Sequence, residues 1–376
     1  MRRILLFVVS IVLVIGMLLP IGCASAPKQV LEDQQIRYFD IIAAADGYIY
    51  YVPYGIDAIY RATENGNEAE IVIEAPSLES FLTLDGWIYY IRASADGSSI
   101  TDMYKVRPDG SDNQSFCQGV YSHVFYTGGH STVAYQDGWI YFIHGNGESS
   151  DGWGELSVAK IRPDGSGFTI MLTPFHSGDL ILSEGHIYYG DWTEALGENY
   201  SYCSSIKKAN LNTGDVTTLV PVTLEPSAEE NDAAFVFGVF DGWVYYESTY
   251  DGSRKMRPDG TEDQPADNYP LYSDGEWLYF NSALSSSRRD NADNGPPMVA
   301  DELVLYRTHY DDSGREDLYS EEYTGLSQIS ITSAGIYIVK SDYNTLDVTF
   351  EKYSLSGEKE STTVMPGILW QSEEVC

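Results

Sequence analysis

A short phrase occurs seven times in this chain of 376 residues: an acidic or small residue, then Gly, then an aromatic-rich stretch. Consecutive copies start 33 to 60 residues apart. The copies are Asp46-Gly47-Tyr48-Ile49-Tyr50-Tyr51, Asp85-Gly86-Trp87-Ile88-Tyr89-Tyr90, Asp137-Gly138-Trp139-Ile140-Tyr141-Phe142, Glu184-Gly185-His186-Ile187-Tyr188-Tyr189, Asp241-Gly242-Trp243-Val244-Tyr245-Tyr246, Asp274-Gly275-Glu276-Trp277-Leu278-Tyr279-Phe280 and Ala334-Gly335-Ile336-Tyr337-Ile338. This interval between strand-turn-strand phrases is typical of the blades of a β-propeller.

Each copy is followed by a second strand-like stretch that ends in a tight turn, as in Pro108-Asp109-Gly110 and Pro163-Asp164-Gly165. Pro presets the first turn angle, Asp accepts a local backbone hydrogen bond, and Gly takes the left-handed position that closes a hairpin. With an inner strand such as 132–136 and an outer one such as 169–172, each repeat supplies four strands. We therefore predict an all-β fold, a seven-bladed β-propeller of four-stranded antiparallel blades; the uneven spacing also allows six or eight blades.

Equivalent places in the repeat hold Trp87, Trp139, Trp243 and Trp277, which we expect to pack between blades, not to form ligand cages. The ring must also hide its sheet edges. We expect 37–44 to form the inner strand of the first blade and 361–365 the outer strand of the last, so that the two ends of the domain meet.

The chain starts with Met1-Arg2-Arg3 and an apolar run that ends just before Cys23. A basic start, an apolar stretch and a small residue before Cys indicate an export signal. The segment resembles a lipoprotein signal, which implies that residues 1–22 are removed and that Cys23 becomes the lipidated first residue. The alternative is an uncleaved membrane anchor. Either reading places the protein outside the cytoplasm, anchored to the cell membrane, with 23–36 as a flexible tether and 37–376 as a single propeller domain.

The chain is strongly acidic, with 56 Asp and Glu against 22 Lys and Arg. Such a charge repels nucleic acid and anionic headgroups, so we expect no nucleic-acid partner. It keeps an exported protein soluble, and some of the carboxylates also allow Ca²⁺ binding, although no EF-hand loop is present. We expect no other cofactor.

Three cysteines remain once Cys23 is assigned to lipid: Cys117, Cys203 and Cys376. They have neither the C-x-x-C spacing nor the His pairs of a metal site, so we expect no metal centre. A disulfide between Cys117 and Cys203 is compatible with an oxidising compartment, but the sequence does not decide it.

If the four strands of each blade alternate in direction, the Asp-Gly and Pro-Asp-Gly turns fall on one face and the long connections on the other. Those connections are 118–131, 145–155, 191–204, 221–232 and 281–302, and binding residues usually lie in such loops. We expect a ligand to meet this face around the central channel. The candidate ligand-binding residues are the aromatics outside the repeat register and one nearby histidine: Trp153, Trp192, Tyr126, Tyr200, Tyr202 and His144. Alternatively, these side chains pack under their own loops.

The repeat D-G-W-I-Y-Y, followed by L-Y-R or Y-K-V and then D-G-S or D-G-T, resembles the YWTD propeller repeat of the low-density-lipoprotein-receptor type. It is most similar to a family of bacterial exported lipoprotein propellers of unknown function. The resemblance covers about residues 37–366, although the Thr-Asp that closes the receptor signature is absent. It implies an extracytoplasmic binding or scaffold role and supplies no catalytic residue.

No G-x-S-x-G elbow, P-loop or H-E-x-x-H motif occurs, so we assign no catalytic residue and expect a non-enzymatic protein. We predict a lipid-anchored cell-surface propeller that binds or scaffolds a peptide, protein or cell-wall glycan. One alternative is a propeller glycoside hydrolase or polysaccharide lyase, because 56 acids supply many carboxylate pairs. Another is a sensor domain that works with a membrane partner.

Overall fold

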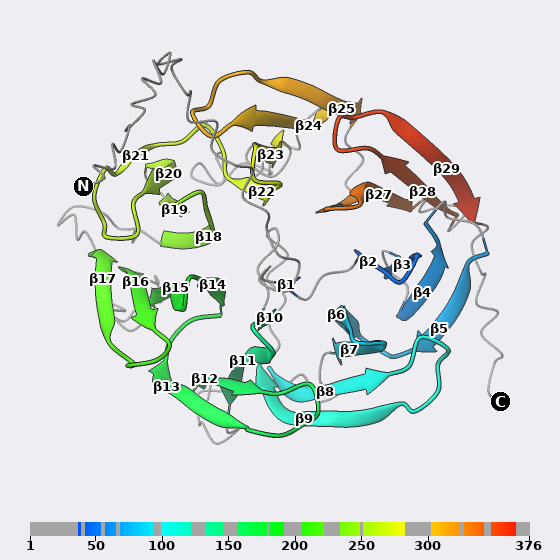
Figure 1. Ribbon diagram of the computed structural model, residues 1–376, viewed down its shortest axis with the longest axis horizontal. Helices are drawn as coiled ribbons and strands as arrows, with labels where there is room; N and C mark the ends of the chain where they lie inside the picture. The colour runs from blue at the N-terminus through cyan, green and yellow to red at the C-terminus, as the bar shows by residue number, and fades with distance from the viewer. Residues whose placement is uncertain are drawn as a thin grey trace, which may run out of the picture.

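The computed structural model describes residues 37–38, 42–53, 57–64, 68–92, 99–121, 132–145, 156–178, 180–191, 205–221, 234–248, 251–282, 302–322, 327–341 and 347–365. In these ranges the chain forms antiparallel β-strands arranged in a ring, which Figure 1 shows end-on. No helix in the described part of the chain has the length and apolar character needed to cross a membrane. The predicted all-β propeller fold is confirmed.

Strand pairing gives five four-stranded sheets and one nine-stranded sheet. We call each group of four consecutive strands from β2 onward a unit and number the units first to seventh in chain order. The units are β2 (Ile42–Ala45), β3 (Tyr48–Tyr51), β4 (Ala58–Thr63) and β5 (Glu70–Glu74); β6 (Leu78–Leu84), β7 (Trp87–Arg92), β8 (Ile100–Val106) and β9 (Gln114–Tyr121); β10 (Val133–Gln136), β11 (Trp139–Gly145), β12 (Leu156–Ile161) and β13 (Thr169–Phe175); β14 (Ile181–Ser183), β15 (His186–Asp191), β16 (Ser205–Asn210) and β17 (Val216–Val220); β18 (Ala234–Phe240), β19 (Trp243–Ser248), β20 (Gly252–Met256) and β21 (Gln264–Pro265); β22 (Pro270–Ser273), β23 (Trp277–Asn281), β24 (Glu302–His309) and β25 (Glu316–Glu322); β26 (Ser327–Thr332), β27 (Gly335–Ser341), β28 (Val348–Tyr353) and β29 (Lys359–Met365). The nine-stranded sheet consists of β1 (Arg37–Tyr38) and the second and third units, which are joined where His144 of β11 pairs with Val120 of β9. In Figure 1, the earliest strands β2, β6, β10, β14, β18 and β22 lie nearest the centre of the ring.

The Asp-Gly phrase makes the turn between the first and second strand of a unit. In the second unit, Asp85 has a φ of 51° and Gly86 a φ of 67°. Two successive positive φ angles define the type I′ hairpin, whose twist matches that of the flanking strands. The first, third, fourth and fifth units have the same pair of positive angles, whereas in the sixth and seventh only Gly275 and Gly335 do.

The Pro-Asp-Gly phrase makes the turn between the third and fourth strand, as predicted. In the second unit, the Gly110 N–H donates to the carbonyl of Arg107 over 2.9 Å. The Asp109 carboxylate accepts from the backbone N–H of Ser111 at 3.0 Å and from its hydroxyl at 2.6 Å. Because these bonds are local, the turn forms from its own sequence.

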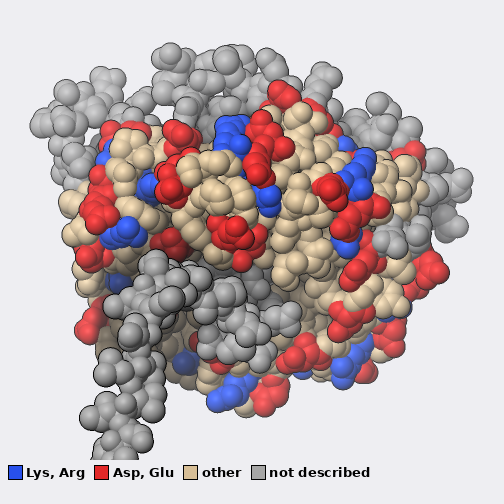
Figure 2. All heavy atoms as spheres, turned by 45° about the horizontal axis from the view of Figure 1, so that its top comes forward, with Lys and Arg blue, Asp and Glu red and all other residues tan. Residues whose placement is uncertain are grey.

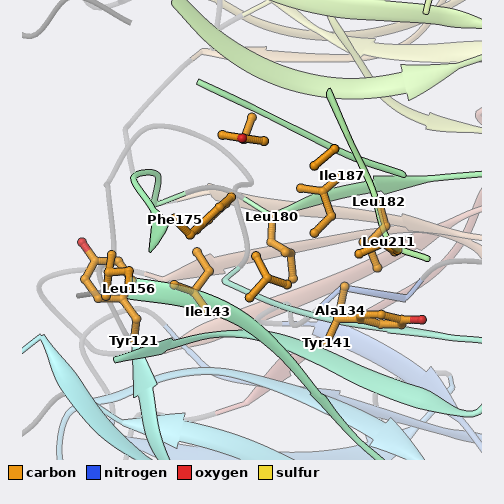
Figure 3. Close-up of a cluster of buried hydrophobic side chains, with 13 residues drawn as sticks. Tyr121, Ala134, Tyr141, Ile143, Leu156, Phe175, Leu180, Leu182, Ile187 and Leu211 are labelled. Atoms are coloured by element: carbon orange, nitrogen blue, oxygen red, sulfur yellow. The ribbon is translucent and has the colours of Figure 1, made fainter. Parts of the chain in front are cut away.

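Buried apolar side chains separate each unit from the next. Seven clusters of such residues occur among the described residues, one at each junction between consecutive units and one between the seventh and the first. Figure 3 shows the cluster at the third and fourth units, where Ile143 and Phe175 face Leu180 and Ile187. Each sheet thus buries both faces against its neighbours, which is the principal source of stability in such repeats.

The junction between the seventh and first units closes the ring. Tyr51 of the first unit packs on Phe350 of the seventh with ring centroids 6.0 Å apart, and both side chains are fully buried. In the same junction, the hydroxyl of Ser330 donates to the carbonyl of Ile42 at 3.5 Å. Strand β29 is the outer strand of the last unit, in agreement with the prediction for 361–365.

The first strand corrects the prediction for residues 37–44. Only β2 forms the inner strand of the first unit; β1 (Arg37–Tyr38) lies near the centre of the ring and pairs antiparallel with β10 of the third unit (Figure 1). Arg37 is opposite Tyr135, and Tyr38 is opposite Ala134. A two-residue strand has too short a pattern to specify its partner, so this pairing depends on the assembled ring.

Candidate functional site

The two faces of the ring differ because the strands of each unit are antiparallel. The described Asp-Gly-type and Pro-Asp-Gly-type turns join first to second or third to fourth strands, so they lie on one face, which we call the turn face. The strand ends that flank the connections from second to third strands, and those that flank the connections from one unit to the next, lie on the opposite face, which we call the loop face. The predicted segregation of turns and connections therefore follows directly from the strand order.

Each unit carries a Tyr on its second strand directly opposite a Lys or Arg on its third strand. The sequence did not reveal this repeated pair, because the number of residues between the Tyr and its Lys or Arg partner differs from unit to unit. The pairs are Tyr50 and Arg61, Tyr89 and Lys105, Tyr141 and Lys160, Tyr188 and Lys208, Tyr245 and Lys255, Tyr279 and Arg307, and Tyr337 and Lys352.

Members of these pairs bind the turn of the next unit. Lys208 Nζ donates to the carbonyl of Pro258 at 3.3 Å, and Lys255 Nζ lies 2.6 Å from the carboxylate of Asp312. Arg307 donates to the carbonyl of Leu355 at 3.0 Å. These contacts hold neighbouring units in register at the turn face, so its cations are already engaged within the protein.

The repeat tryptophans are covered by guanidinium groups. Arg107 lies 3.7 Å from the ring centroid of Trp87, and Arg257 lies 3.7 Å from that of Trp243. Trp139 and Trp277 have the same arrangement. The four rings are half-buried, and Trp87, Trp139 and Trp243 pack against the apolar clusters between units, as predicted. A guanidinium group lies over each ring, so the rings are not open ligand cages.

The loop face carries the ends of the five long connections. The flanking residues that the structure describes include Tyr121 and Thr132, Gly145 and Leu156, Asp191 and Ser205. The predicted ligand-binding residues Trp153, Trp192, Tyr126, Tyr200 and Tyr202, and the predicted lipidation site Cys23, lie outside the described residues.

His144 is the one predicted site residue that the structure describes. It lies near the end of β11 opposite Ser157, and Val120 of the second unit pairs with it from the other side. Its ring meets Phe168 edge-on with centroids 5.5 Å apart, and Nδ1 is buried without a hydrogen-bond partner. His144 therefore lies in the seam between two units, where a Cβ added to Gly119 would lie 2.6 Å from its ring.

An ion pair anchors the connection that follows β15. Asp191, the last residue of this strand, is buried and lies 2.5 Å from Lys207 Nζ on the neighbouring strand β16. A buried carboxylate requires such a partner. The pair holds Asp191, the last described residue before the 192–204 connection, at the loop face. It could not be predicted from the sequence, because the two residues meet only across the sheet.

A second ion network lies at the seam between the sixth and seventh units. The buried carboxylate of Glu351 accepts from Lys359 at 2.5 Å, from Lys340 at 3.0 Å and from the hydroxyl of Tyr353 at 3.0 Å. Lys340 also lies 2.6 Å from Glu321. Burial alone would raise the pKa of Glu351, but the two ammonium groups hold it below its ordinary value. Two cations balance two carboxylates, which suits a structural role.

Within the described ranges, no group of three His, Cys, Asp or Glu side chains is placed to hold a metal ion. Cys117 is a buried free thiol in the cluster between the second and third units, and Cys203 and Cys376 fall outside those ranges. Burial raises the pKa of the Cys117 thiol to about 11. A thiol with such a pKa is protonated at neutral pH and is a poor nucleophile.

The geometry thus combines a rigid ring with two unlike faces. The turn face consists of short hairpins whose charged side chains contact neighbouring units. The loop face carries the long connections, and the centre holds β1 beside β10. This arrangement is suited to presenting loops from a fixed scaffold.

The sequence matches no family model and no curated protein. Among solved structures, the chain is similar to a puromycin hydrolase mutant complexed with PGG, with 12% identity and a TM-score of 0.51 over 86% of this chain and 53% of that chain. It is also similar to a puromycin-hydrolyzing peptidase of Mycobacterium tuberculosis, with 11% identity and a TM-score of 0.50 over 86% of this chain and 52% of that chain. Nidogen, in a complex with laminin, has 13% identity and a TM-score of 0.36, over 58% of this chain and 75% of that one.

The chain spans about half the length of the two peptidases that it matches. At identities this low, the likeness concerns the fold and not the activity. The resemblance to the YWTD repeat family stays a prediction, because no family model matches. The comparisons and the strand pairing agree on the architecture: this chain is a β-propeller.

Proposed function

We propose that this protein is a lipid-anchored propeller at the cell surface that binds or scaffolds a peptide, protein or cell-wall glycan through its loop face, without catalysis. The export signal and Cys23 support the anchor, and the acidic composition disfavours nucleic acid as a partner.

The observation that carries the proposal is the difference between the two faces. On the turn face, Lys208, Lys255 and Arg307 bind the adjacent unit, so these side chains are not free for an external partner. On the loop face, five long connections start and end on strands held by buried clusters. Long loops on a rigid scaffold give a large contact area, and because the scaffold is already ordered, binding loses little of its conformational entropy.

Charge favours a neutral or cationic ligand. The described surface in Figure 2 shows Asp and Glu spread widely, with fewer Lys and Arg between them. An acidic surface repels anionic polymers, whereas sugar rings and peptides stack on exposed Trp and Tyr without needing a positive field. The aromatic residues at 153 and 192 are the candidates for such stacking.

The test uses the full lipoprotein with two probes, purified peptidoglycan and a phage-displayed peptide library. We expect retention of at least one probe without release of soluble products. The double variant Trp153→Ala, Trp192→Ala should weaken retention by roughly tenfold or more. Tyr48→Ala is the matched control, because Tyr48 is an exposed aromatic, 37% accessible, that follows the Asp46-Gly47 turn on the turn face.

Two results would contradict the proposal. Release of soluble fragments from the glycan would identify a hydrolase or lyase. Equal retention by the wild type, the double variant and the Tyr48→Ala control would exclude the loop aromatics from binding.

A further inference from the structure

We propose that the turn face is directed toward the membrane and the loop face away from it, because β1 brings the N-terminal segment into the ring from the turn face. This inference rests on the lipid anchoring at Cys23 proposed above. It adds to that proposal the orientation of the propeller and the side from which a partner reaches it.

The direction of β1 follows from its pairing with β10. Strand β10 begins at Val133 on the loop face and ends at Gln136, directly before the Asp137-Gly138 turn. Because β1 is antiparallel to β10, with Arg37 opposite Tyr135, it runs from the turn face toward the loop face. Arg37, the first described residue, therefore lies on the turn-face side of Tyr38.

The start of β2 supports this direction. Strand β2 runs from Ile42 to Ala45 and is followed by the Asp46-Gly47 turn, so Ile42 lies toward the loop face. Strand β1, which ends at Tyr38, runs toward the same face. The four-residue step from 38 to 42 spans at most about 14 Å, which is compatible with two strands near the centre of one ring.

The length of chain between Cys23 and Arg37 limits where the anchor lies. Fourteen residue steps have a root-mean-square span of about 20 Å as a flexible coil and at most about 50 Å when fully extended. To bring the anchor to the loop face, the tether would pass outward across three strand spacings, about 14 Å, and then along a seven-residue strand, about 24 Å. That path of about 38 Å is roughly twice the root-mean-square span of the tether. Stretching the tether this far is entropically unfavourable, so the anchor lies on the turn side.

The charge of the turn face indicates that it does not bind anionic lipid directly. Asp109, Asp164 and Asp259 are fully exposed there. Each carboxylate accepts hydrogen bonds from the hydroxyl and the backbone N–H of the Ser or Thr that follows two residues later, and these bonds lower its pKa. These groups are ionised at neutral pH and repel anionic headgroups within a Debye length of about 8 Å. The tether, not a basic surface, would hold the propeller near the bilayer.

The test measures energy transfer from single-cysteine donors to a headgroup acceptor in vesicles that carry the lipidated protein. Glu276→Cys places the donor in the exposed turn between β22 and β23, and His176→Cys places it at an exposed position after β13 on the loop face. Both are made in a background with Cys203→Ser and Cys376→Ser, in which the buried Cys117 stays unlabelled. We expect the donor at 276 to lie about 20 Å closer to the bilayer than the donor at 176.

A second pair of variants tests the role of β1 itself. Arg37→Pro with Tyr38→Pro removes the two backbone N–H groups of β1. Without this strand, the tether leaves from the start of β2 on the loop face, so the donor at 176 should become the closer one. Inserting twenty Gly and Ser residues after residue 30 keeps β1 but lengthens the flexible span to about 32 Å, and should only reduce the difference between the donors.

The outcomes separate the two proposals. If the wild type and a Cys23→Ser variant partition equally into the aqueous fraction, the anchor is absent and both proposals fail. If the wild type is membrane-bound but the donor at 176 is equally close or closer, the orientation is wrong while the anchor stands. An unchanged difference in the double-proline variant, with an unchanged melting temperature, would show that β1 does not set the orientation.

Discussion

Lys352 Nζ of the seventh unit lies 3.7 Å from the carboxylate of Glu64 in the first unit. Lys208 and Lys255 contact the turn of the next unit in the same way. In the Lys352 contact, the next unit is the first one, so the contact lies where the ring closes. The Lys352 side chain is 11% exposed and that of Glu64 is 45% exposed. An ion pair this accessible contributes at most about 1 kcal/mol, so the apolar cluster beneath it has the larger part in closing the ring.

We therefore expect Phe350→Ala to lower the free energy of unfolding by about 3–5 kcal/mol, because it leaves a cavity against Tyr51 and Tyr337. Glu64→Gln should lower it by less than about 1 kcal/mol. Urea denaturation measures both. Equal losses for the two variants would mean that charge, not packing, closes the ring, and a soluble cooperative fragment lacking residues 350–376 would show that closure is unnecessary.

Gly110→Ala should be more destabilising than Gly214→Ala. Both glycines have positive φ angles, of 79° and 74°, so each substitution has the same backbone strain of about 1 kcal/mol. A Cβ at Gly110 would also lie 2.7 Å from the carbonyl oxygen of Val72 in the adjacent unit, whereas nothing lies within 4 Å of one at Gly214.

The difference between the two melting temperatures isolates the contact between units. We expect the Gly110 variant to melt several degrees below the Gly214 variant, since a clash with backbone cannot be relieved by a rotamer change. Identical melting curves would show that the turn can shift away from Val72 without cost.

Glu351 should make stability depend on pH in the acidic range. Its ammonium partners hold the pKa of the folded-state carboxyl below the ordinary value near 4.3. A carboxyl whose pKa is lower in the folded state than in the unfolded state raises the free energy of unfolding. This contribution is fully present above the unfolded-state pKa and is lost as the pH falls through the folded-state pKa. The contribution is therefore present at neutral pH and disappears below about pH 4.

Replacing Glu351 with Gln tests this. At pH 7 we expect a loss of about 3 kcal/mol in unfolding free energy, because two cations lose a buried partner. The gap between wild type and variant should narrow below about pH 4. Glu316→Gln, which removes an exposed partner of Arg307, is the control and should cost less than about 1 kcal/mol at pH 7. A gap that stays constant from pH 7 to pH 3 would contradict the role assigned to Glu351.

Cys117 should be unreactive in the folded protein. Its side chain is 8% exposed, and burial raises its pKa to about 11, so the thiolate is scarce at pH 8. Alkylation of the native protein followed by peptide mapping should leave Cys117 unmodified, and alkylation in urea should modify it. Rapid native alkylation would contradict the packing in this seam, and a peptide linked to Cys203 would contradict the free thiol.

The candidate site was less accessible to sequence reasoning than the fold. Turn positions and aromatic strands are local, so the Asp85-Gly86 hairpin and the face on which it lies could be predicted. The sequence indicated His144 only as a candidate binding residue near a long connection, whereas its neighbours Val120 and Phe168 come from elsewhere in the chain. The arginines that cover Trp87 and Trp243 each precede a Pro-Asp-Gly turn in the sequence, but only the structure places their guanidinium groups over these rings.

The amino-acid sequence alone determined the hairpin, its repetition and the separation of turns from long connections, because type I′ and Pro-Asp-Gly turns form from neighbouring residues. Only the tertiary structure decided that β1 pairs with the third unit and that Glu351 forms ion pairs with two lysines from different strands. These strand edges and charged side chains come together only when the sheets pack into a ring. Several strand edges are equivalent, and no short stretch of sequence encodes which of them a strand such as β1 pairs with.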